Sequence, residues 1–344
     1  MYKKLLLVFF LVFLLSACSG GGGSDPAPNN TPPPTPPQDI NGGGVKGPLA
    51  NADVTAYAFD ASQPGFKGAE ISTGNTDASA AIVGLALPIP LNPPYILEFT
   101  ANATTTDLTT GVAPIISTMR TVITQAMLDG GEQIYATPLT TMAIDIAVKN
   151  ADSSVPPYTG NNDTTVTAEE FLAALDIAAQ QVVSTLGFGL NNSVNIFDTP
   201  PLINDATTTP AQQTAVAQYR TAVEAMTAMV NHLGVNIANP PVSAEEMLTA
   251  LTNDLGDGAI DGSTGGPIDS TVMDELVNTD PATLPIPNTD NGSGNPFTPG
   301  DVERILVEEK DDTDSTTATD DLENQTITVT PQPAVTAPDI DGDG

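Results

Sequence analysis

Three aspartates follow one another at short intervals in a glycine-rich stretch, at Asp254, Asp257 and Asp261. Carboxylate oxygens on a tight loop are the ligands that calcium prefers, so this stretch is a candidate calcium site. The spacing lacks the glutamate that completes an EF-hand loop. The other interpretation is a turn that ends the preceding helix.

A second aspartate series stands at the end of the sequence, at Asp339, Asp341 and Asp343. Aspartate at the first, third and fifth places, with Gly344 at the sixth, copies the start of an EF-hand or thrombospondin-type calcium loop. The remaining ligands of such a loop do not follow. We therefore interpret the series as a partial motif that binds calcium weakly.

Few other residues suit catalysis. His232 is the only histidine, no Gly-x-Ser-x-Gly nucleophile turn is present, and helical spacing places His232 on a polar face near a helix C-terminus. The pairs Glu169–Glu170 and Glu245–Glu246 could supply the two carboxylates of glycoside hydrolysis. Both pairs fall in the first turns of predicted helices, where carboxylates are favourable without any chemistry. The sequence therefore predicts no catalytic residue and no enzyme.

Cys18 is the only cysteine, and it follows lysines, an apolar run over 5–14 and two small residues. This order is typical of a signal peptide over 1–17, and a cysteine thiolate is a good nucleophile for acylation. The stretch 15–18 resembles the lipobox of bacterial lipoproteins, which implies cleavage before Cys18 and an anchor of palmitate-type chains. By the same resemblance, Ser19 implies the outer membrane, on its periplasmic or cell-surface face. The alternative is a secretory signal with an incidental cysteine.

The composition is strongly acidic, with 9 lysines and arginines against 42 aspartates and glutamates among 344 residues, a net charge of −33. Loss of the leader with Lys3 and Lys4 leaves 7 basic residues against 42 acidic ones, a net charge of −35. Nucleic acid is excluded as a partner, because phosphate binding needs clustered basic residues. We expect membrane contact only through lipid on Cys18. Residues 18–41, rich in glycine and then proline, predict an extended tether.

Residues 42–110 show alternation of period two, with turn signals at proline, glycine and asparagine, which predicts a small antiparallel β-sandwich. The stretch 44–57 resembles the first hairpin of carboxypeptidase-regulatory-like (transthyretin-like) modules, and 76–78 and 95–99 match a later turn and strand. Ala80 departs from the turn glycine of that family. The resemblance implies a stalk or recognition unit rather than an activity.

Residues 111–264 show helical periodicity, which predicts an α-helical bundle. The expected helices run from Pro114 to about 128, from Pro138, from 168 to 186 behind a Thr167 and Glu170 capping box, from 210 to 233, and from 244 behind Ser243. The stretches 137–143 and 254–262 are similar to those of uncharacterised surface lipoproteins of marine Gram-negative bacteria. The whole chain is thus expected to be α+β and multidomain.

Residues 265–344 are rich in glycine, proline, asparagine and aspartate, and predict an acidic tail of low order. Two short β-prone runs, 305–307 and 327–329, allow a hairpin, but a free tail is favoured.

Taken together, these patterns predict a membrane-anchored envelope lipoprotein with a structural, adhesive or recognition role, whose partner is an envelope or extracellular component. The alternative is an accessory or catalytic unit for extracellular polymer degradation that uses acidic residues and calcium. Two carboxylates that converge in a cleft would favour the alternative, whereas dispersed carboxylates would not.

Overall fold

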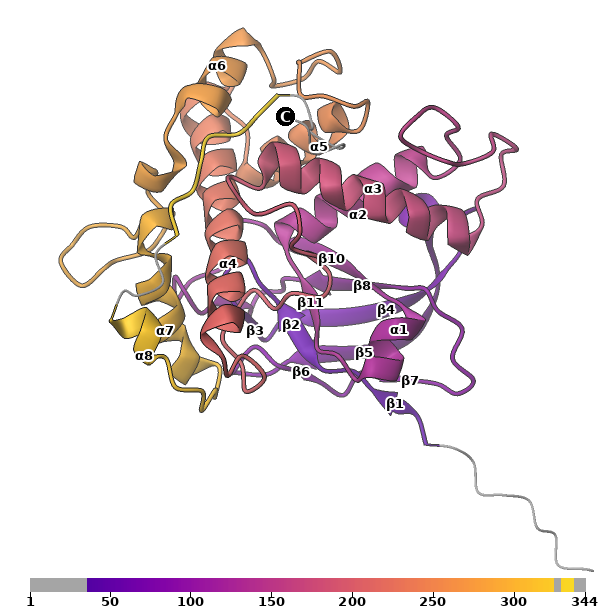
Figure 1. Ribbon diagram of the computed structural model, residues 1–344, viewed down its shortest axis with the longest axis horizontal. Helices are drawn as coiled ribbons and strands as arrows, with labels where there is room; N and C mark the ends of the chain where they lie inside the picture. Colours follow the sequence, from indigo (N-terminus) through magenta and orange to yellow (C-terminus); the bar gives the residue numbers. More distant parts are fainter. Residues whose placement is uncertain (1–35, 325–328, 337–344) are drawn as a thin grey trace, which may run out of the picture. The chain divides into compact units, whose positions relative to one another are not determined.

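The computed structural model describes residues 36–324 and 329–336, and it contains both strands and helices. Strands come first along the chain and most helices follow, which confirms the expected mixture of α and β structure (Figure 1). The leader, Cys18 and the final aspartate series lie outside the described residues. The tether ends before residue 41, because β1 (Gln38–Asp39) pairs with a later strand and Ile40 is buried.

The largest sheet has five antiparallel strands in the order β10, β8, β4, β5, β6. In β4, the buried residues Val54 and Ala56 alternate with more exposed ones, as a period of two predicts. The bounds are Asp53–Phe59 for β4, Lys67–Thr76 for β5, Ile82–Val83 for β6, Tyr95–Thr100 for β8 and Thr118–Ile123 for β10.

Shorter strands cover one face of this sheet. Gly44 lies so close to it that a Cβ atom there would stand 3.1 Å from a ring carbon of Phe99. These strands form only two-stranded pairs, so the predicted β-sandwich is not confirmed. The pairs are β1 with β7 (Ala86–Leu87), β3 (Leu49–Ala50) with β9 (Thr106–Asp107), and β2 (Gly42–Gly44) in parallel with β11 (Ile134–Ala136).

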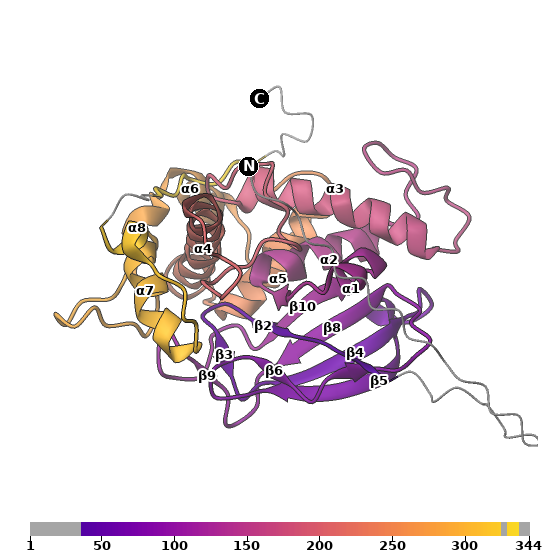
Figure 2. The same ribbon diagram turned by 60° about the horizontal axis from the view of Figure 1, so that its bottom comes forward.

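Helices cover the opposite face of the sheet, where α2 (Pro138–Asn150), α3 (Ala168–Leu186) and α5 (Ala244–Leu255) lie together (Figure 2). Phe59 of β4 stacks on Phe171 of α3 with ring centroids 5.3 Å apart. Arg120 of β10 pairs with Asp145 of α2, with 2.6 Å between Nη2 and Oδ2. Strands and helices therefore share one hydrophobic core.

The four predicted helices after residue 136 are confirmed, including α4 (Pro210–Asn231). Each begins behind a hydroxyl residue whose side chain accepts a hydrogen bond from the first helical turn. A π-helical turn, η2 (His232–Ile237), continues α4. Because α2 packs against β10 as well as against α3 and α5, the predicted self-contained helical bundle is not confirmed.

The expected helix from Pro114 to 128 is wrong. This segment forms β10 and then the short helix α1 (Gln125–Gly130), which Thr124 caps. Residues 118–123 alternate and include β-branched Thr121, Val122 and Ile123, and they pair along the whole length of β8. Pairing with an available strand edge outweighed the weak helical pattern.

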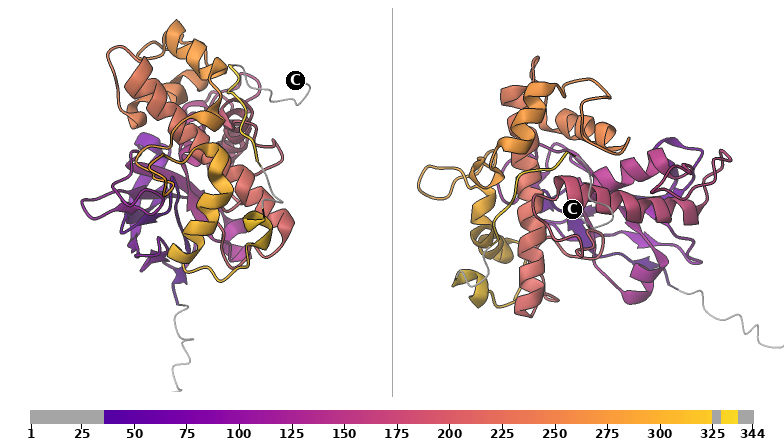
Figure 3. Two further views of the ribbon diagram at one scale, coloured as in Figure 1. Left: turned by 90° about the vertical axis from the view of Figure 1, so that its left-hand side faces the viewer. Right: turned by 45° about the horizontal axis from the view of Figure 1, so that its top comes forward.

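The expectation of a free tail after residue 265 is also wrong for the described residues. The run 305–307 is helical, because buried Val302, Ile305 and Leu306 have helical spacing. The helix that contains them, α7 (Val302–Asp312), lies beside α4 (Figure 3). The run 327–329 lies largely outside the described residues. The later helices are α6 (Ser270–Asn278), α7 (Val302–Asp312) and α8 (Asp320–Glu323), and the 3-10 turns are η1 (Pro64–Phe66), η3 (Pro281–Thr283) and η4 (Pro299–Asp301).

None of the helices in the described part of the chain is both long enough and apolar enough to cross a bilayer.

Candidate functional site

Three acidic side chains from separate segments meet at one cavity of about 220 Å³ beside α1 and α3. Glu132 follows α1, Asp176 lies on α3, and Asp198 lies in the segment after α3. The other lining residues are mostly apolar: Val122, Thr124, Ala126, Met127, Leu172, Leu175, Asn195 and Phe197.

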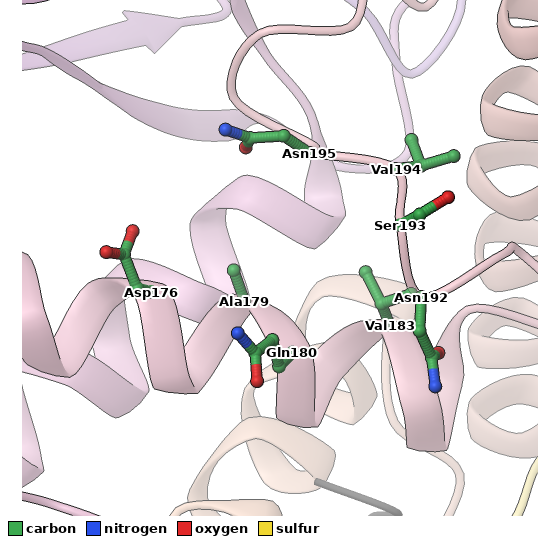
Figure 4. A pocket seen from close by; sticks show the side chains of 8 residues that line it. All are labelled: Asp176, Ala179, Gln180, Val183, Asn192, Ser193, Val194 and Asn195. Atoms are coloured by element: carbon green, nitrogen blue, oxygen red, sulfur yellow. The ribbon is translucent and has the colours of Figure 1, made fainter. Parts of the chain in front are cut away.

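A second cavity of about 220 Å³ adjoins the first, because Asp176 and Asn195 line both. In Figure 4, Asp176 points from α3 toward the segment that carries Asn195. The remaining lining is neutral: Ala179, Gln180, Val183, Asn192, Ser193 and Val194. We call the two neighbouring cavities together the acidic cleft.

Local sequence explains how these groups are placed. Gly131 ends α1 with a φ of 64°, a left-handed conformation that favours glycine, and the chain then turns to present Glu132. Asn195 holds its own segment: its Oδ1 accepts the Phe197 N–H at 3.0 Å, and its Nδ2 donates to the Asp198 carboxylate. Asp176 and Leu172 are one helical turn apart, so they share a face of α3.

All three carboxyl groups have raised pKa values although they are exposed. Partial desolvation raises the pKa of Glu132, and the negative charge of Asp198 adds to this effect. Desolvation also raises the pKa of Asp176. For Asp198, desolvation raises the pKa, the hydrogen bond from Asn195 opposes the rise, and the charge of Asp176 adds to it. Repulsion across the cleft therefore acts between Asp198 and Glu132 and between Asp198 and Asp176.

This arrangement suits a cation. No lysine, arginine or histidine lines either cavity in the described residues, so nothing of the chain's own offsets the three charges there. A ligand with a positive group and an apolar stem would neutralise the carboxylates and cover the apolar lining residues. Glu132 and Asp176 accept no hydrogen bond from another described side chain or backbone group, so they are free to adjust to such a ligand.

The first predicted calcium loop is brought together, but its central carboxylate is already occupied. Asp254 is fully buried, and its oxygens accept hydrogen bonds from the N–H groups of Asp261 and Gly262, at 2.8 Å each, and from both the N–H and the hydroxyl of Thr264. Burial alone would raise the pKa of Asp254, but these hydrogen bonds outweigh it and lower the pKa. Asp257 accepts from the Ser263 hydroxyl. The geometry is that of a turn that ends α5.

Calcium therefore has no assembled site at this loop. In residues 36–324 and 329–336, no group of three or more histidine, cysteine, aspartate or glutamate side chains is arranged to hold a metal ion. The aspartates at 339, 341 and 343 lie beyond these residues, and so does Cys18.

The remaining candidates take the places that helix geometry predicts. His232 follows the last residue of α4, with its Nε2 3.5 Å from a carboxylate oxygen of Glu275. Glu170 and Glu246 complete capping boxes at the starts of α3 and α5. Glu245 accepts from the Ser117 hydroxyl. None of these candidate residues lines the acidic cleft.

Sequence reasoning missed the residues of the acidic cleft. Glu132, Asp176 and Asp198 belong to three segments with no shared motif, and each resembles the many other carboxylates of an acidic chain. Only the packing of α1 and the segment after α3 brings them together. Comparison with family models, with curated proteins and with solved structures finds no match.

Proposed function

We propose that this chain is a lipid-anchored protein of the outer membrane whose folded part recognises a cationic partner without changing it chemically. The lipobox-like stretch 15–18 supports the anchor, and Ser19 supports the outer membrane. The observation that carries the recognition role is the convergence of Glu132, Asp176 and Asp198 on cavities that no basic side chain lines in the described residues. The net charge of −33 adds a field that attracts cations from a distance.

Recognition fits the cleft better than turnover does. Acid–base catalysis needs groups held within hydrogen-bond reach of the reacting atoms and oriented by neighbours. Asp198 has such a neighbour in Asn195, whereas Glu132 and Asp176 have none among the described residues. Attraction of a cation by charge does not require fixed carboxylates, so mobile side chains suit it.

We also propose that residues 42–110 are a carboxypeptidase-regulatory-like module that supports the helices carrying the cleft. The antiparallel pairing of β4 with both β5 and β8 supports this proposal. Modules of that family mostly act as stalks or recognition units, in line with a role without catalysis.

The anchor is tested by metabolic labelling of expressing Gram-negative cells with radioactive palmitate. We expect label in the mature protein and its recovery in the outer-membrane fraction, and we expect Cys18→Ser to lose both. Unlabelled protein with an unmodified N-terminus in the medium would refute the anchor.

The recognition role is tested by calorimetry with tetralysine as the cationic probe and tetraglutamate as its opposite. We expect tetralysine alone to bind, with an affinity that falls as salt is added. Asp176→Asn should weaken binding most, because Asp176 lines both cavities. Asp274→Asn on α6 removes an equal charge from an exposed position outside the cleft and should have little effect. Equal weakening by the two variants would show that overall charge, and not the cleft, attracts the probe.

The alternative, a unit for extracellular polymer degradation, is favoured by one observation, the raised pKa values of three carboxyl groups in one cleft. A raised pKa suits a general acid, and Asp198 would be the best-placed group. Release of new reducing ends from a soluble polysaccharide by the full chain, lost in Asp198→Asn, would support this role. Loss of that activity on removal of calcium by a chelator would add calcium as a cofactor.

A further inference from the structure

Five ionisable side chains that do not line the acidic cleft meet in the interior, where none is more than 5% exposed. We call them the buried ionic cluster: Lys46 between β2 and β3, Asp107 of β9, Arg220 and Glu224 of α4, and Glu309 of α7. Two cations face three carboxylates, so charges of both signs are enclosed in the interior. Burial of an isolated charge costs several kcal/mol of desolvation free energy, so each member of the cluster depends on the others.

Lys46 and Asp107 form the tightest pair. The lysine Nζ lies 2.8 Å from Oδ2 of Asp107, and the two side chains are 1% and 0% exposed. The other oxygen, Oδ1, accepts the backbone N–H of Thr109 at 2.9 Å. A Cβ atom on Gly47 would lie only 2.0 Å from that oxygen, so the backbone holds the carboxyl group in place from a second side. The amine and the carboxyl group cannot drift apart.

Glu224 supplies a third group, with one carboxylate oxygen free to accept a hydrogen bond or a proton. Its Oε1 accepts from Nε of Arg220 at 2.9 Å, while its Oε2 is buried with no hydrogen-bond partner among the described residues. Glu309 takes the other donors of Arg220 and a hydrogen bond from Thr109. Burial would lower the pKa of Lys46, but the charges of Asp107 and Glu224 outweigh it and raise the pKa. Hydrogen bonds link Glu224 to the Lys46–Asp107 pair: Arg220 donates to Glu224 and also to the hydroxyl of Thr109, at 3.0 Å. The backbone N–H of that threonine donates to Asp107.

We propose that Lys46 and Asp107 become joined by an intramolecular amide bond, with Glu224 as the proton acceptor. The established contacts provide each element of the reaction: a nucleophilic nitrogen against a carboxyl group, a backbone N–H on the oxygen that becomes negative, and an unpartnered carboxylate oxygen.

The step balances within the chain. One proton moves from Nζ to Oδ2, which gives a neutral amine and a carboxylic acid. Nζ then attacks Cγ of Asp107, and negative charge develops on Oδ1, where the Thr109 N–H stabilises it. A second proton passes from Nζ through Glu224 to the leaving hydroxyl group, which departs as water. One proton stays on the new amide nitrogen, and no oxidant, reductant or other reactant is needed.

Burial favours the product. Water is excluded from a pair with 1% and 0% exposure, so hydrolysis of the amide is suppressed once the released water has left. The reaction removes one positive and one negative charge from the interior, which leaves the balance of the cluster unchanged. The bond would span 61 residues of sequence and fasten the β2–β3 connection to β9.

The test is the intact mass of the full chain after denaturation, followed by trypsin digestion. We expect a mass one water below that of the linear polypeptide with its N-terminal processing taken into account. We also expect no cleavage after Lys46 and a branched peptide that joins the segments of Lys46 and Asp107. A full linear mass together with cleavage after Lys46 would overturn the proposal.

Variants separate the bond from the ion pair. Lys46→Arg keeps the positive charge, and we expect it to keep the full linear mass. In Asp107→Asn the same attack releases ammonia in place of water, so the mass should fall by one ammonia. Glu224→Gln should slow bond formation about 100-fold or more, the usual contribution of general acid–base catalysis. An unchanged rate in Glu224→Gln would overturn the role of Glu224.

Lys67→Arg is the matched control. Lys67 also contacts a carboxylate at 2.7 Å, that of Glu98, but this lysine is 30% exposed. The variant should lose one water from its mass like the parent chain. Retention of that water in Lys67→Arg would show that the mass change arises at Lys67, and would overturn the assignment to Lys46.

Discussion

The acidic cleft and the buried ionic cluster contain the same kinds of carboxylate in opposite circumstances. In the cleft, Glu132, Asp176 and Asp198 are exposed, carry charge of one sign and have no basic neighbour among the lining residues. In the buried ionic cluster, the carboxylates are enclosed and interleaved with Lys46 and Arg220. Water stabilises the first group of charges, whereas only the chain itself can stabilise the second.

This difference indicates where each region can act. A cleft with uncompensated charge gains free energy when an external cation enters, so it is suited to recognition. A cluster that is closed to solvent and paired with the chain's own cations is not reached by an external ion, but it holds reactive groups together. In our proposals, the cleft therefore faces a partner, and the buried ionic cluster acts on the chain's own structure.

The largest expected effect on stability comes from a substitution in the buried ionic cluster. Arg220→Met removes the guanidinium that contacts both Glu224 and Glu309 and leaves two carboxylates enclosed without it. We expect a loss of about 3–5 kcal/mol in the free energy of unfolding, the usual cost of removing one partner from a buried ion pair. Urea unfolding followed by circular dichroism measures it.

Arg304→Met provides the matched control for that loss. Arg304 also pairs with a glutamate one turn along its helix, Glu308, at 3.6 Å, but it is 45% exposed. We expect this variant to change the free energy of unfolding by less than about 1 kcal/mol. Similar losses in the two arginine variants would remove the distinction between enclosed and exposed charge.

Local signals explain which parts of the fold could be predicted. Thr137 before Pro138, and Ser243 three residues before Glu246, are read from neighbours in sequence, and the helices begin where these signals stand. The segment 118–123 failed because its conformation depends on the free edge of β8, a partner that no local pattern reveals. Val302 and Ile305 show the same limit, since a composition typical of disorder concealed an apolar face that packs on α4.

The sites follow the same division. Glu170 and Glu246 could be assigned to capping boxes from their spacing alone. The pairing of Lys46 with Asp107 could not be predicted from the sequence, because the two residues are 61 positions apart. Nothing in the local sequence shows that this lysine is buried. The carboxylates of the acidic cleft come from three segments that only tertiary packing unites. Where charge is abundant, sequence position says little about which charges meet.

Asp254 extends the comparison, because it is buried like the ionic cluster but its charge is stabilised by hydrogen bonds and not by a cation. Asp254→Asn replaces one accepting oxygen with a donor that faces N–H groups. We expect a loss of about 1–3 kcal/mol in the free energy of unfolding. Asp257→Asn, at an exposed position in the same loop, should cost less than about 0.5 kcal/mol.

The pH dependence of Asp254 provides a second check. Its pKa is lowered in the folded chain from an ordinary value of 3.8, so the unfolded chain binds a proton more readily. Its contribution is therefore complete above pH 3.8 and is lost as the pH falls through the lower folded pKa. The difference between parent and Asp254→Asn should shrink as the pH falls below 3.8. A constant difference over that range would mean that the charge of Asp254 does not matter.

The smallest expected effect lies on the exposed side, at Asp176. Removing this charge relieves repulsion with Asp198, so Asp176→Asn should raise the free energy of unfolding at neutral pH. The gain should be less than about 1 kcal/mol, because water screens exposed charges.

The sign of this effect follows from the pKa of Asp176, which folding raises above 3.8. The folded chain holds the proton more tightly, so the parent loses this stability as the pH rises through the raised pKa, and the variant does not. Unfolding curves at pH 3 and pH 7, about 0.8 units below and about 3.2 units above the ordinary value of 3.8, bracket the change. A stability that falls in Asp176→Asn at neutral pH would show that Asp176 has a stabilising partner, and the cleft would then resemble the buried ionic cluster more than its opposite.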